Sequence, residues 1–264
     1  MARGEDVAGR QRGPLALGGQ APPQVSDRVE QVCIAENVAR VRERIARAAE
    51  RSGRRGEGIR LVAVAKQITA AQVKEAIAAG VGEVGENYVQ EAAAKQAEIG
   101  AEVRWHFIGH LQTNKAGQAA RIFDMIHTVD SVRLAQALAR RAQQLGRTLE
   151  VLAQVNTSGE GSKFGVAPEE AESLVASIAT MTGVQVQGLM TIGLWHPDPE
   201  RGRPEFRLLA DLAKRVQDRT GVEMQWLSMG MSHDFEVAIE EGANLVRVGT
   251  AIFGARPAGR GQVL

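Results

Sequence analysis

One lysine stands at the end of a strand built from small apolar residues. The stretch 61–66 is LVAVAK, and because side chains alternate along a strand, Val62, Val64 and Lys66 share one face. If the two valines fill a core, burial removes water from the amine and favours its neutral form. A neutral lysine amine attacks aldehydes, so the pattern favours Schiff-base chemistry at Lys66. The alternative is a lysine that only marks where the strand leaves the core.

An arginine occupies a similar inward position in the last apolar stretch. In residues 244–250, NLVRVGT, the same alternation places Leu245, Arg247 and Gly249 on one face. An unpaired guanidinium in a core is very costly, so an acid or a ligand must meet it. A salt bridge inside the core is the alternative to a ligand.

Two turns rich in glycine and hydroxyl side chains could bind an anion. The first, SMGMS at 228–232, contains Ser228 and Gly230, and the second contains Gly249 and Thr250. Either turn alone is weak evidence, because turns use these residue types anyway. Two such turns after the last two strands match the place where α/β barrels often bind phosphate.

These residues lie within a regular alternation of short β-branched runs and helical stretches. We predict strands at 60–65, 83–84, 105–108, 125–128, 150–155, 186–192, 225–228 and 245–248. The predicted helices are 70–79, 89–99, 115–120, 132–145, 168–180, 205–219 and 233–240. Strict alternation favours parallel strands, since every parallel connection needs a crossover. Eight units predict a single (β/α)8 TIM-type barrel, with Lys66 and Arg247 on neighbouring strands, and a doubly wound sheet is the alternative.

The ends of the chain differ from this alternation. Apolar residues spaced by three or four predict an extra N-terminal helix over about 26–52, with Ser26 and Asp27 as plausible caps. Residues 1–25 are rich in Gly, Pro, Arg and Gln and are predicted to form a flexible tail. We therefore expect a barrel domain over 26–256 and a short C-terminal tail over 257–264.

Composition excludes several classes of protein. The formal net charge is +1, which gives no support for a nucleic-acid surface. The single cysteine, Cys33, rules out an internal disulfide, and no Cys/His spacing indicates a metal site. No apolar run reaches the length of a membrane span, and the first residues carry charges without an apolar segment, so no signal peptide is expected. The sequence predicts a cytoplasmic protein with no membrane partner.

Seven stretches together resemble the YggS/PROSC family of pyridoxal 5′-phosphate (PLP) homeostasis proteins. In chain order they are LVAVAK at 61–66, GENY at 85–88, WHFIGHLQTNK at 105–115, VNTSGEGSKFG at 155–165, GLMT at 188–191, LSMGMSHD at 227–234 and VRVGTAIFG at 246–254. The resemblance covers about Ser26–Gly254, and together the stretches are highly specific although each alone is not. The resemblance implies a PLP-binding barrel of the kind found in the N-terminal domain of bacterial alanine racemases.

By motif, the resemblance also implies roles for single residues. Lys66 would hold PLP as an internal aldimine, Arg247 would face the pyridine nitrogen, and Asn87 would lie beside the ring. Ser228, Gly230, Gly249 and Thr250 would hold the phosphate.

Other residues of the motifs receive weaker interpretations. Ser232 is a weaker phosphate candidate or a helix N-cap, and Met190 is expected in the core. His106 and His110 are expected to make structural hydrogen bonds. The roles of Lys115 and Lys163 stay open.

The resemblance favours a carrier over an enzyme. It implies a PLP homeostasis factor that stores, buffers or delivers PLP, without catalytic residues, as a monomer with apo-enzymes as transient clients. A PLP-dependent amino-acid racemase is the alternative, but it needs a second acid/base, which racemases take from a tyrosine in an additional domain. This chain stops ten residues after Gly254, and its only tyrosine is Tyr88. A Schiff-base aldolase, in which Lys66 attacks a substrate directly, is a further alternative.

Overall fold

A computed structural model describes residues 33–100, 102–161 and 163–255. The described residues all belong to one compact unit. Both predicted tails lie outside the described residues, as do Ser26 and Asp27. The domain boundaries at 25 and 256 therefore stay predictions.

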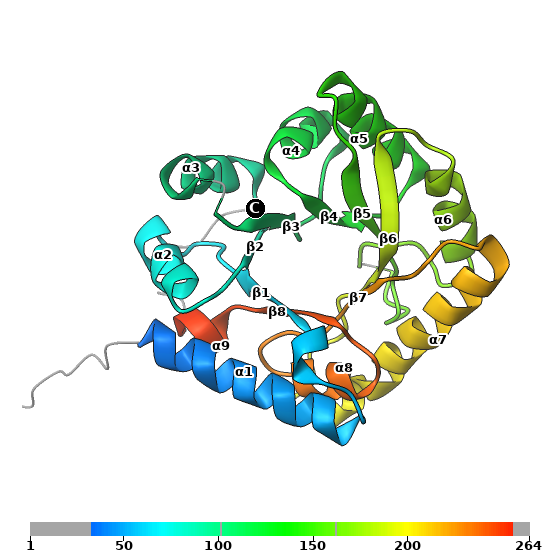
Figure 1. Cartoon of the computed structure of the whole chain (residues 1–264). Helices are drawn as coiled ribbons and strands as arrows, with labels where there is room; N and C mark the ends of the chain where they lie inside the picture. The colour runs from blue at the N-terminus through cyan, green and yellow to red at the C-terminus, as the bar shows by residue number, and fades with distance from the viewer. Residues whose placement is uncertain (1–32, 101, 162, 256–264) are drawn as a thin grey trace, which may run out of the picture. The chain divides into compact units, whose positions relative to one another are not determined.

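The strands close into a parallel barrel of eight (Figure 1). They are β1 Arg60–Val64, β2 Glu83–Glu86, β3 Arg104–Phe107, β4 Met125–Val129, β5 Leu149–Gln154, β6 Val184–Met190, β7 Trp226–Ser228 and β8 Leu245–Val248. Pairing follows chain order, and β8 pairs with β1 to complete the ring. This confirms the predicted TIM-type barrel and excludes the doubly wound sheet, which would leave two open edges.

Helices follow the strands around the outside of the barrel (Figure 1). They are α1 Ile34–Arg51, α2 Ala70–Ala78, α3 Val89–Ile99, α4 Ala116–Ile122, α5 Val132–Gln144, α6 Ala171–Ala179, α7 Arg203–Thr220, α8 Phe235–Glu240 and α9 Thr250–Phe253, with 3-10 turns η1 Gly56–Gly58, η2 Thr113–Lys115 and η3 Pro199–Gly202. The described part of the extra N-terminal helix, α1, contacts α2, α8 and α9 and so covers the junction of β1 and β8. The short α9 is not among the predicted helices.

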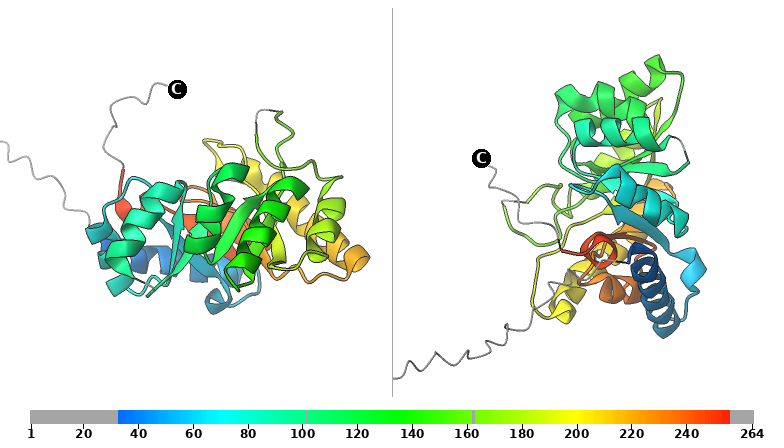
Figure 2. Two further views of the ribbon diagram at one scale, coloured as in Figure 1. Left: turned by 90° about the horizontal axis from the view of Figure 1, so that it is seen from above. Right: turned by 90° about the vertical axis from the view of Figure 1, so that its left-hand side faces the viewer.

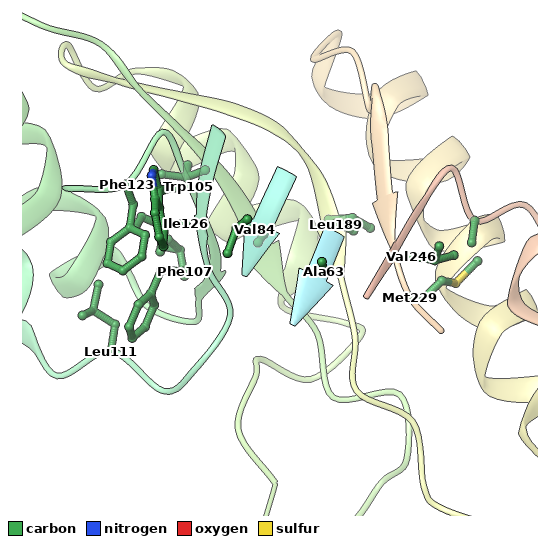
Figure 3. Packing of buried hydrophobic residues seen from close by; sticks show 14 of the residues in the cluster. Ala63, Val84, Trp105, Phe107, Leu111, Phe123, Ile126, Leu189, Met229 and Val246 are labelled. Carbon is green, nitrogen blue, oxygen red and sulfur yellow. The ribbon is translucent and has the colours of Figure 1, made fainter. Parts of the chain in front are cut away.

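The alternation of side chains along the strands produces two cores. Inside the barrel, Val62, Met125, Leu152, Met190 and Leu245 form one buried cluster. The other face of each strand packs against the helices, where the much larger outer core lies, part of it around Trp105, Phe107 and Phe123 (Figure 3). Ala63 and Ala65 belong to the outer core. The predicted inward face of β1 is therefore confirmed for Val62, and Lys66 lies two residues beyond the end of the strand.

Charged side chains close the N-terminal end of the barrel. The Arg60 guanidinium lies 3.9 Å from the centre of the Trp226 ring and 3.4 Å from a Glu83 oxygen. Arg104 Nη2 lies 2.7 Å from Glu150 Oε2. The contact of Arg60 with Glu83 joins the paired strands β1 and β2, whereas those of Arg60 with Trp226 and of Arg104 with Glu150 join strands that do not pair. We call the opposite end the open end; there the strands reach their carboxyl termini, and the loops after β5 and β6 stand out on the same side (Figure 2).

Two absences hold for the described part of the chain. None of its helices combines the length and the apolar composition needed to cross a membrane. Its His, Cys, Asp and Glu side chains form no group of three or more that could hold a metal ion.

Candidate functional site

The chain turns sharply just after Lys66. Strand β1 ends at Val64, Lys66 is half-buried, and Gln67 has φ of 61°. Among the described residues Gln67 is the only one other than glycine with a positive φ. Such a conformation costs about 1–3 kcal/mol and persists only where neighbouring contacts enforce it. The turn therefore needs support from outside β1.

A buried lysine on α3 supplies part of that support. Lys95 Nζ donates to the Ala65 carbonyl at 2.5 Å, to Glu86 Oε1 at 2.6 Å and to Glu91 Oε1 at 2.7 Å. Lys95 is 7% exposed and Glu86 is fully buried. Burial of two opposite charges is tolerated here because each has a partner at short distance.

The same cluster holds the peptide on the other side of Lys66. The Gln67 N–H donates to Glu91 Oε1 at 2.6 Å, and that oxygen also accepts from Lys95. Lys95 and Glu91 thus bind the backbone directly before and directly after Lys66. Sequence reasoning missed this cluster, because a lysine and a glutamate in an Ala/Glu/Lys-rich helix look like ordinary surface residues.

The buried Glu86 carboxyl makes stability depend on pH. Burial raises its pKa to about 7, and the hydrogen bond and charge of Lys95 oppose that rise. The folded state therefore binds more protons than the unfolded state between the ordinary pKa near 4.5 and about 7. Stability contributed by this group falls as pH rises through that range, by at most about 3 kcal/mol.

We expect Glu86→Gln to remove this pH dependence, since glutamine keeps an acceptor for Lys95 but does not ionise. The measurement is urea unfolding of both proteins at several pH values between about 4.5 and 7.5. As pH rises, the free energy of unfolding of the variant should increase relative to that of the wild type by up to about 3 kcal/mol. Parallel stability profiles would show that Glu86 does not titrate in this range.

Arg247 lies inside the barrel beside β1. It is 3% exposed, and its register partner on β1 is Val62. Its guanidinium donates to Ser228 Oγ at 2.5 Å and to the Thr191 carbonyl at 2.8 Å. Burial lowers the pKa of Arg247 to about 10, and Asp234 opposes that fall, so the side chain is charged at neutral pH. Both acceptors are neutral, and no ion pair to it occurs among the described residues, so the salt-bridge alternative is not what the structure shows.

Ser228 is the last residue of β7 and stands directly before the turn. Ser228 is fully buried, and its hydroxyl contacts Arg247 and, at 2.9 Å, His127 Nδ1. Ser232 is placed differently, because its Oγ accepts from Gly249 N at 3.1 Å and from Ala251 N at 3.3 Å. Ser228 as a phosphate ligand stays a prediction, but the geometry makes Ser232 the better candidate.

Glycine is required where the turns after β7 and β8 meet. Gly230 has φ of 90°, and a Cβ there would lie 2.6 Å from the Cβ of Ala238. Its carbonyl accepts from Arg247 N at 3.0 Å, which ties the β7 turn to β8. A Cβ on Gly249 would lie 3.3 Å from the Cβ of Val64 on β1. Gly249 is followed by the exposed Thr250, so both stand at the open end of the barrel near the end of β1.

Asn87 directly follows β2 and is half-buried. Its backbone packs tightly against the end of β3, since a Cβ on Gly109 would lie 2.3 Å from the Asn87 carbonyl oxygen. The next residue, Tyr88, is exposed at the start of α3. The structure thus places Asn87 at the open end, as its motif implies, while its contact with a ligand stays a prediction.

The remaining motif residues are mostly structural. His106 is fully buried between His127 and Glu83, which confirms its structural interpretation. Met190 belongs to the barrel interior, as expected. His110 stacks on Phe164 with ring centres 3.8 Å apart. Lys163 Nζ donates to the Gly193 carbonyl at 3.0 Å.

One surface cavity of about 790 Å³ lies between α4 and α5, on the outside of the barrel. Its lining includes the basic residues Lys115, Arg121, Arg140 and Arg141. Neither Lys66 nor Arg247 lines this cavity, so it is separate from the candidate site at the open end.

Comparison with known proteins agrees with this geometry. Residues 36–257 match the family model described as the alanine racemase N-terminal domain. An alanine racemase from Clostridium difficile has the same fold, with a TM-score of 0.67 at 16% identity, covering 84% of this chain and 60% of that chain. Fold and site thus define a class, the (β/α)8 barrels of the alanine racemase N-terminal type.

Closer relatives narrow this class. The pyridoxal phosphate homeostasis protein of Pseudomonas aeruginosa is 43% identical over 228 residues, covering 86% of this chain and 97% of that protein. Its Escherichia coli counterpart is 41% identical over 232 residues, covering 84% and 97%. PipY of Synechococcus elongatus, solved with PLP bound, has a TM-score of 0.74 and 37% identity, covering 84% of this chain and all of that one. The chain belongs to the pyridoxal phosphate homeostasis protein family.

Proposed function

We propose that this protein binds PLP and acts in PLP homeostasis, with Lys66 as the residue that attaches the cofactor covalently. The observation that supports this most directly is that two basic residues, Lys66 and Arg247, lie at the junction of β1 and β8. Lys66 follows β1 where the inward alternation ends, and Arg247 is buried on β8 with only neutral acceptors. A ligand with an aldehyde for Lys66, a ring nitrogen that accepts a hydrogen bond from Arg247, and an anionic group matches this arrangement.

The residues present match the parts of PLP. Lys66 would bind the aldehyde carbon, and Arg247 would face the pyridine nitrogen. Gly230, Ser232, Gly249 and Thr250 would hold the phosphate, because two N–H groups there already converge on one oxygen, that of Ser232. Such convergence is how backbone groups bind the oxygens of an anion. Asn87, at the end of β2, would lie beside the ring.

A carrier role is supported over a racemase role. PLP supplies carbanion stabilisation to enzymes when its ring nitrogen is protonated. A permanently charged guanidinium beside that nitrogen disfavours protonation and weakens this chemistry. The relatives that this chain matches over nearly their whole length are named as homeostasis proteins. We therefore propose storage, buffering or delivery of PLP, with apo-enzymes as transient clients.

The test of this function is the visible spectrum of the protein with PLP, before and after reduction with borohydride. A Schiff base absorbs in the visible range and loses that absorption on reduction. We expect both observations, together with transfer of PLP to an apo-enzyme and no racemisation of amino acids above background. A protein that binds no PLP would exclude the proposal, and racemase turnover would favour the alternative.

Arg247→Glu should change the electronic state of the bound cofactor. A carboxylate beside the ring nitrogen favours its protonation, so the absorption spectrum should shift and side transamination of added amino acids should appear. Arg247→Lys, which keeps the positive charge, is the matched control and should shift far less. An unchanged spectrum and unchanged PLP retention in the glutamate variant would mean that Arg247 is not beside the nitrogen.

A further inference from the structure

A continuous path of polar contacts crosses the interior of the barrel from Arg247. Arg247 Nη1 lies 2.5 Å from Ser228 Oγ, which lies 2.9 Å from His127 Nδ1. His127 Nε2 lies 2.9 Å from His106 Nδ1, and His106 Nε2 lies 3.1 Å from Glu83 Oε2. The path takes one residue each from β8, β7, β4, β3 and β2.

The path lies within the apolar interior of the barrel. His106, His127 and Ser228 are fully buried, and Arg247 is 3% exposed. On β4, the polar His127 shares its face with Met125, two residues earlier, which belongs to the apolar interior cluster. Apolar residues would fill this space without the cost of burying polar groups, which favours a role for the path beyond packing.

The two ends of the path fix the direction of every hydrogen bond in it. A guanidinium can only donate, and an ionised carboxylate can only accept. Burial alone would raise the pKa of Glu83, but the adjacent His106 side chain and the charges of Arg60 and Arg104 bring it below its usual range. Glu83 is therefore an acceptor at neutral pH.

Between these ends only one arrangement of neutral groups works. Burial and the charge of Arg247 lower the pKa of His127 well below its ordinary value, so its ring is neutral. Ser228 accepts from Arg247 and donates to His127 Nδ1, whose Nε2–H then donates to His106 Nδ1. His106 Nε2, which carries the ring proton, lies 3.1 Å from Glu83 Oε2 but off the axis of a hydrogen bond, and neither atom has a hydrogen-bonding partner among the described residues.

The competing arrangement places a proton on both nitrogens of His106. His127 would then have to donate through Nδ1 to Ser228 Oγ, which already accepts from Arg247. The hydroxyl proton of Ser228 would be left without an acceptor among its contacts in the described structure. The arrangement with both histidine rings neutral, in which every hydrogen bond points from Arg247 toward Glu83, avoids this cost. The cost is about 1–3 kcal/mol for a buried unsatisfied group.

We propose that Glu83, His106 and His127 are positioning residues that, through Ser228, hold the Arg247 guanidinium in a single orientation toward the pyridine nitrogen of PLP. The proposal rests on the proposed function for its ligand. The hydroxyl of Ser228 donates its proton to His127 and accepts a hydrogen bond from Arg247. It is therefore a link in this path, and Ser232 is the serine left for the phosphate.

The direction of the path can be tested without the cofactor. Nitrogen NMR of the ¹⁵N-histidine-labelled apo-protein at pH 7.5 distinguishes the two neutral tautomers and the charged ring. We expect His106 and His127 both to be neutral and protonated at Nε2. A charged His106, or His127 protonated at Nδ1, would overturn the one-way path.

Three substitutions at two positions of β4 test whether the path positions Arg247. His127→Gln keeps one acceptor and one donor, His127→Leu keeps neither, and Met125→Leu is the control inside the same strand. We expect His127→Leu to shift the spectrum of bound PLP and to weaken PLP and pyridoxal equally, each by about tenfold. His127→Gln should restore most of the wild-type spectrum, and Met125→Leu should leave spectrum and affinities unchanged.

The outcomes separate this proposal from the proposed function. If His127→Leu behaves like Met125→Leu, the path does not position Arg247, and the proposal is wrong even though PLP binds. If the wild type binds no PLP, the proposed function fails, and with it the role of the path, while the NMR result still decides its direction. Should His127→Leu not fold, Ser228→Ala interrupts the same path and must give the same equal loss for both ligands.

Discussion

Lys66→Ala is expected to abolish covalent attachment of PLP and to leave the barrel folded. Lys66 lies beyond the end of β1, at the open end of the barrel, where side chains serve function more than stability. The backbone on either side of it is held by Lys95 and Glu91, which the substitution leaves in place. The measurements are the visible absorption of the protein with excess PLP and its unfolding curve in urea.

Lys115→Ala is the matched control for this experiment. Lys115 also belongs to a matched motif, but it lies at the start of α4, on the outside of the barrel. Its substitution should leave the PLP spectrum unchanged. If Lys66→Ala retained the full visible absorption, the attachment would be to another lysine and the assignment would be wrong.

The double variant Ser232→Ala/Thr250→Val is expected to weaken PLP binding by roughly two to four powers of ten. PLP is short and rigid, so with its aldehyde at β1 and its nitrogen near β8, its phosphate must reach the turns after β7 and β8. Hydrogen bonds to a charged group contribute about 1.5–3 kcal/mol each, and the variant removes two of them. The measurement is the Kd of PLP by titration.

Pyridoxal, which lacks the phosphate, is the control ligand. The double variant should bind pyridoxal nearly as well as the wild type does. An equal loss for both ligands would mean general damage to the pocket, and no loss for either would place the phosphate elsewhere. Ser228→Ala gives the contrast, because its loss should be equal for both ligands if Ser228 acts through Arg247.

The barrel and the inward position of Arg247 could be predicted from the sequence because both follow from local alternation. The strand pattern in LVAVAK and NLVRVGT places Val62, Leu245 and Arg247 inside, and the structure confirms all three. Closure follows from the count of βα units. Boundaries were less accurate, as with α7, which begins at Arg203 rather than 205, since Pro204 suits the first turn of a helix.

The supporting contacts could not be predicted because they join residues far apart in the chain. Lys95 binds Ala65, which lies 30 residues earlier, and His127 binds Ser228, which lies 101 residues later. One signal was available, since His127 shares its strand face with Met125 and is a polar residue at an inward position. The same alternation places Ser228 inward with Trp226, which argues for Ser232 as the serine that faces the ligand.

Borohydride reduction of the PLP-loaded wild-type protein, followed by peptide mapping, tests the attachment site most directly. Reduction converts the Schiff base into a stable secondary amine, so the modified lysine can be read from the peptide that carries the added mass. We predict a single modified peptide with the adduct on Lys66. An adduct on Lys74, Lys95 or Lys115 in place of Lys66 would contradict the assignment of the site.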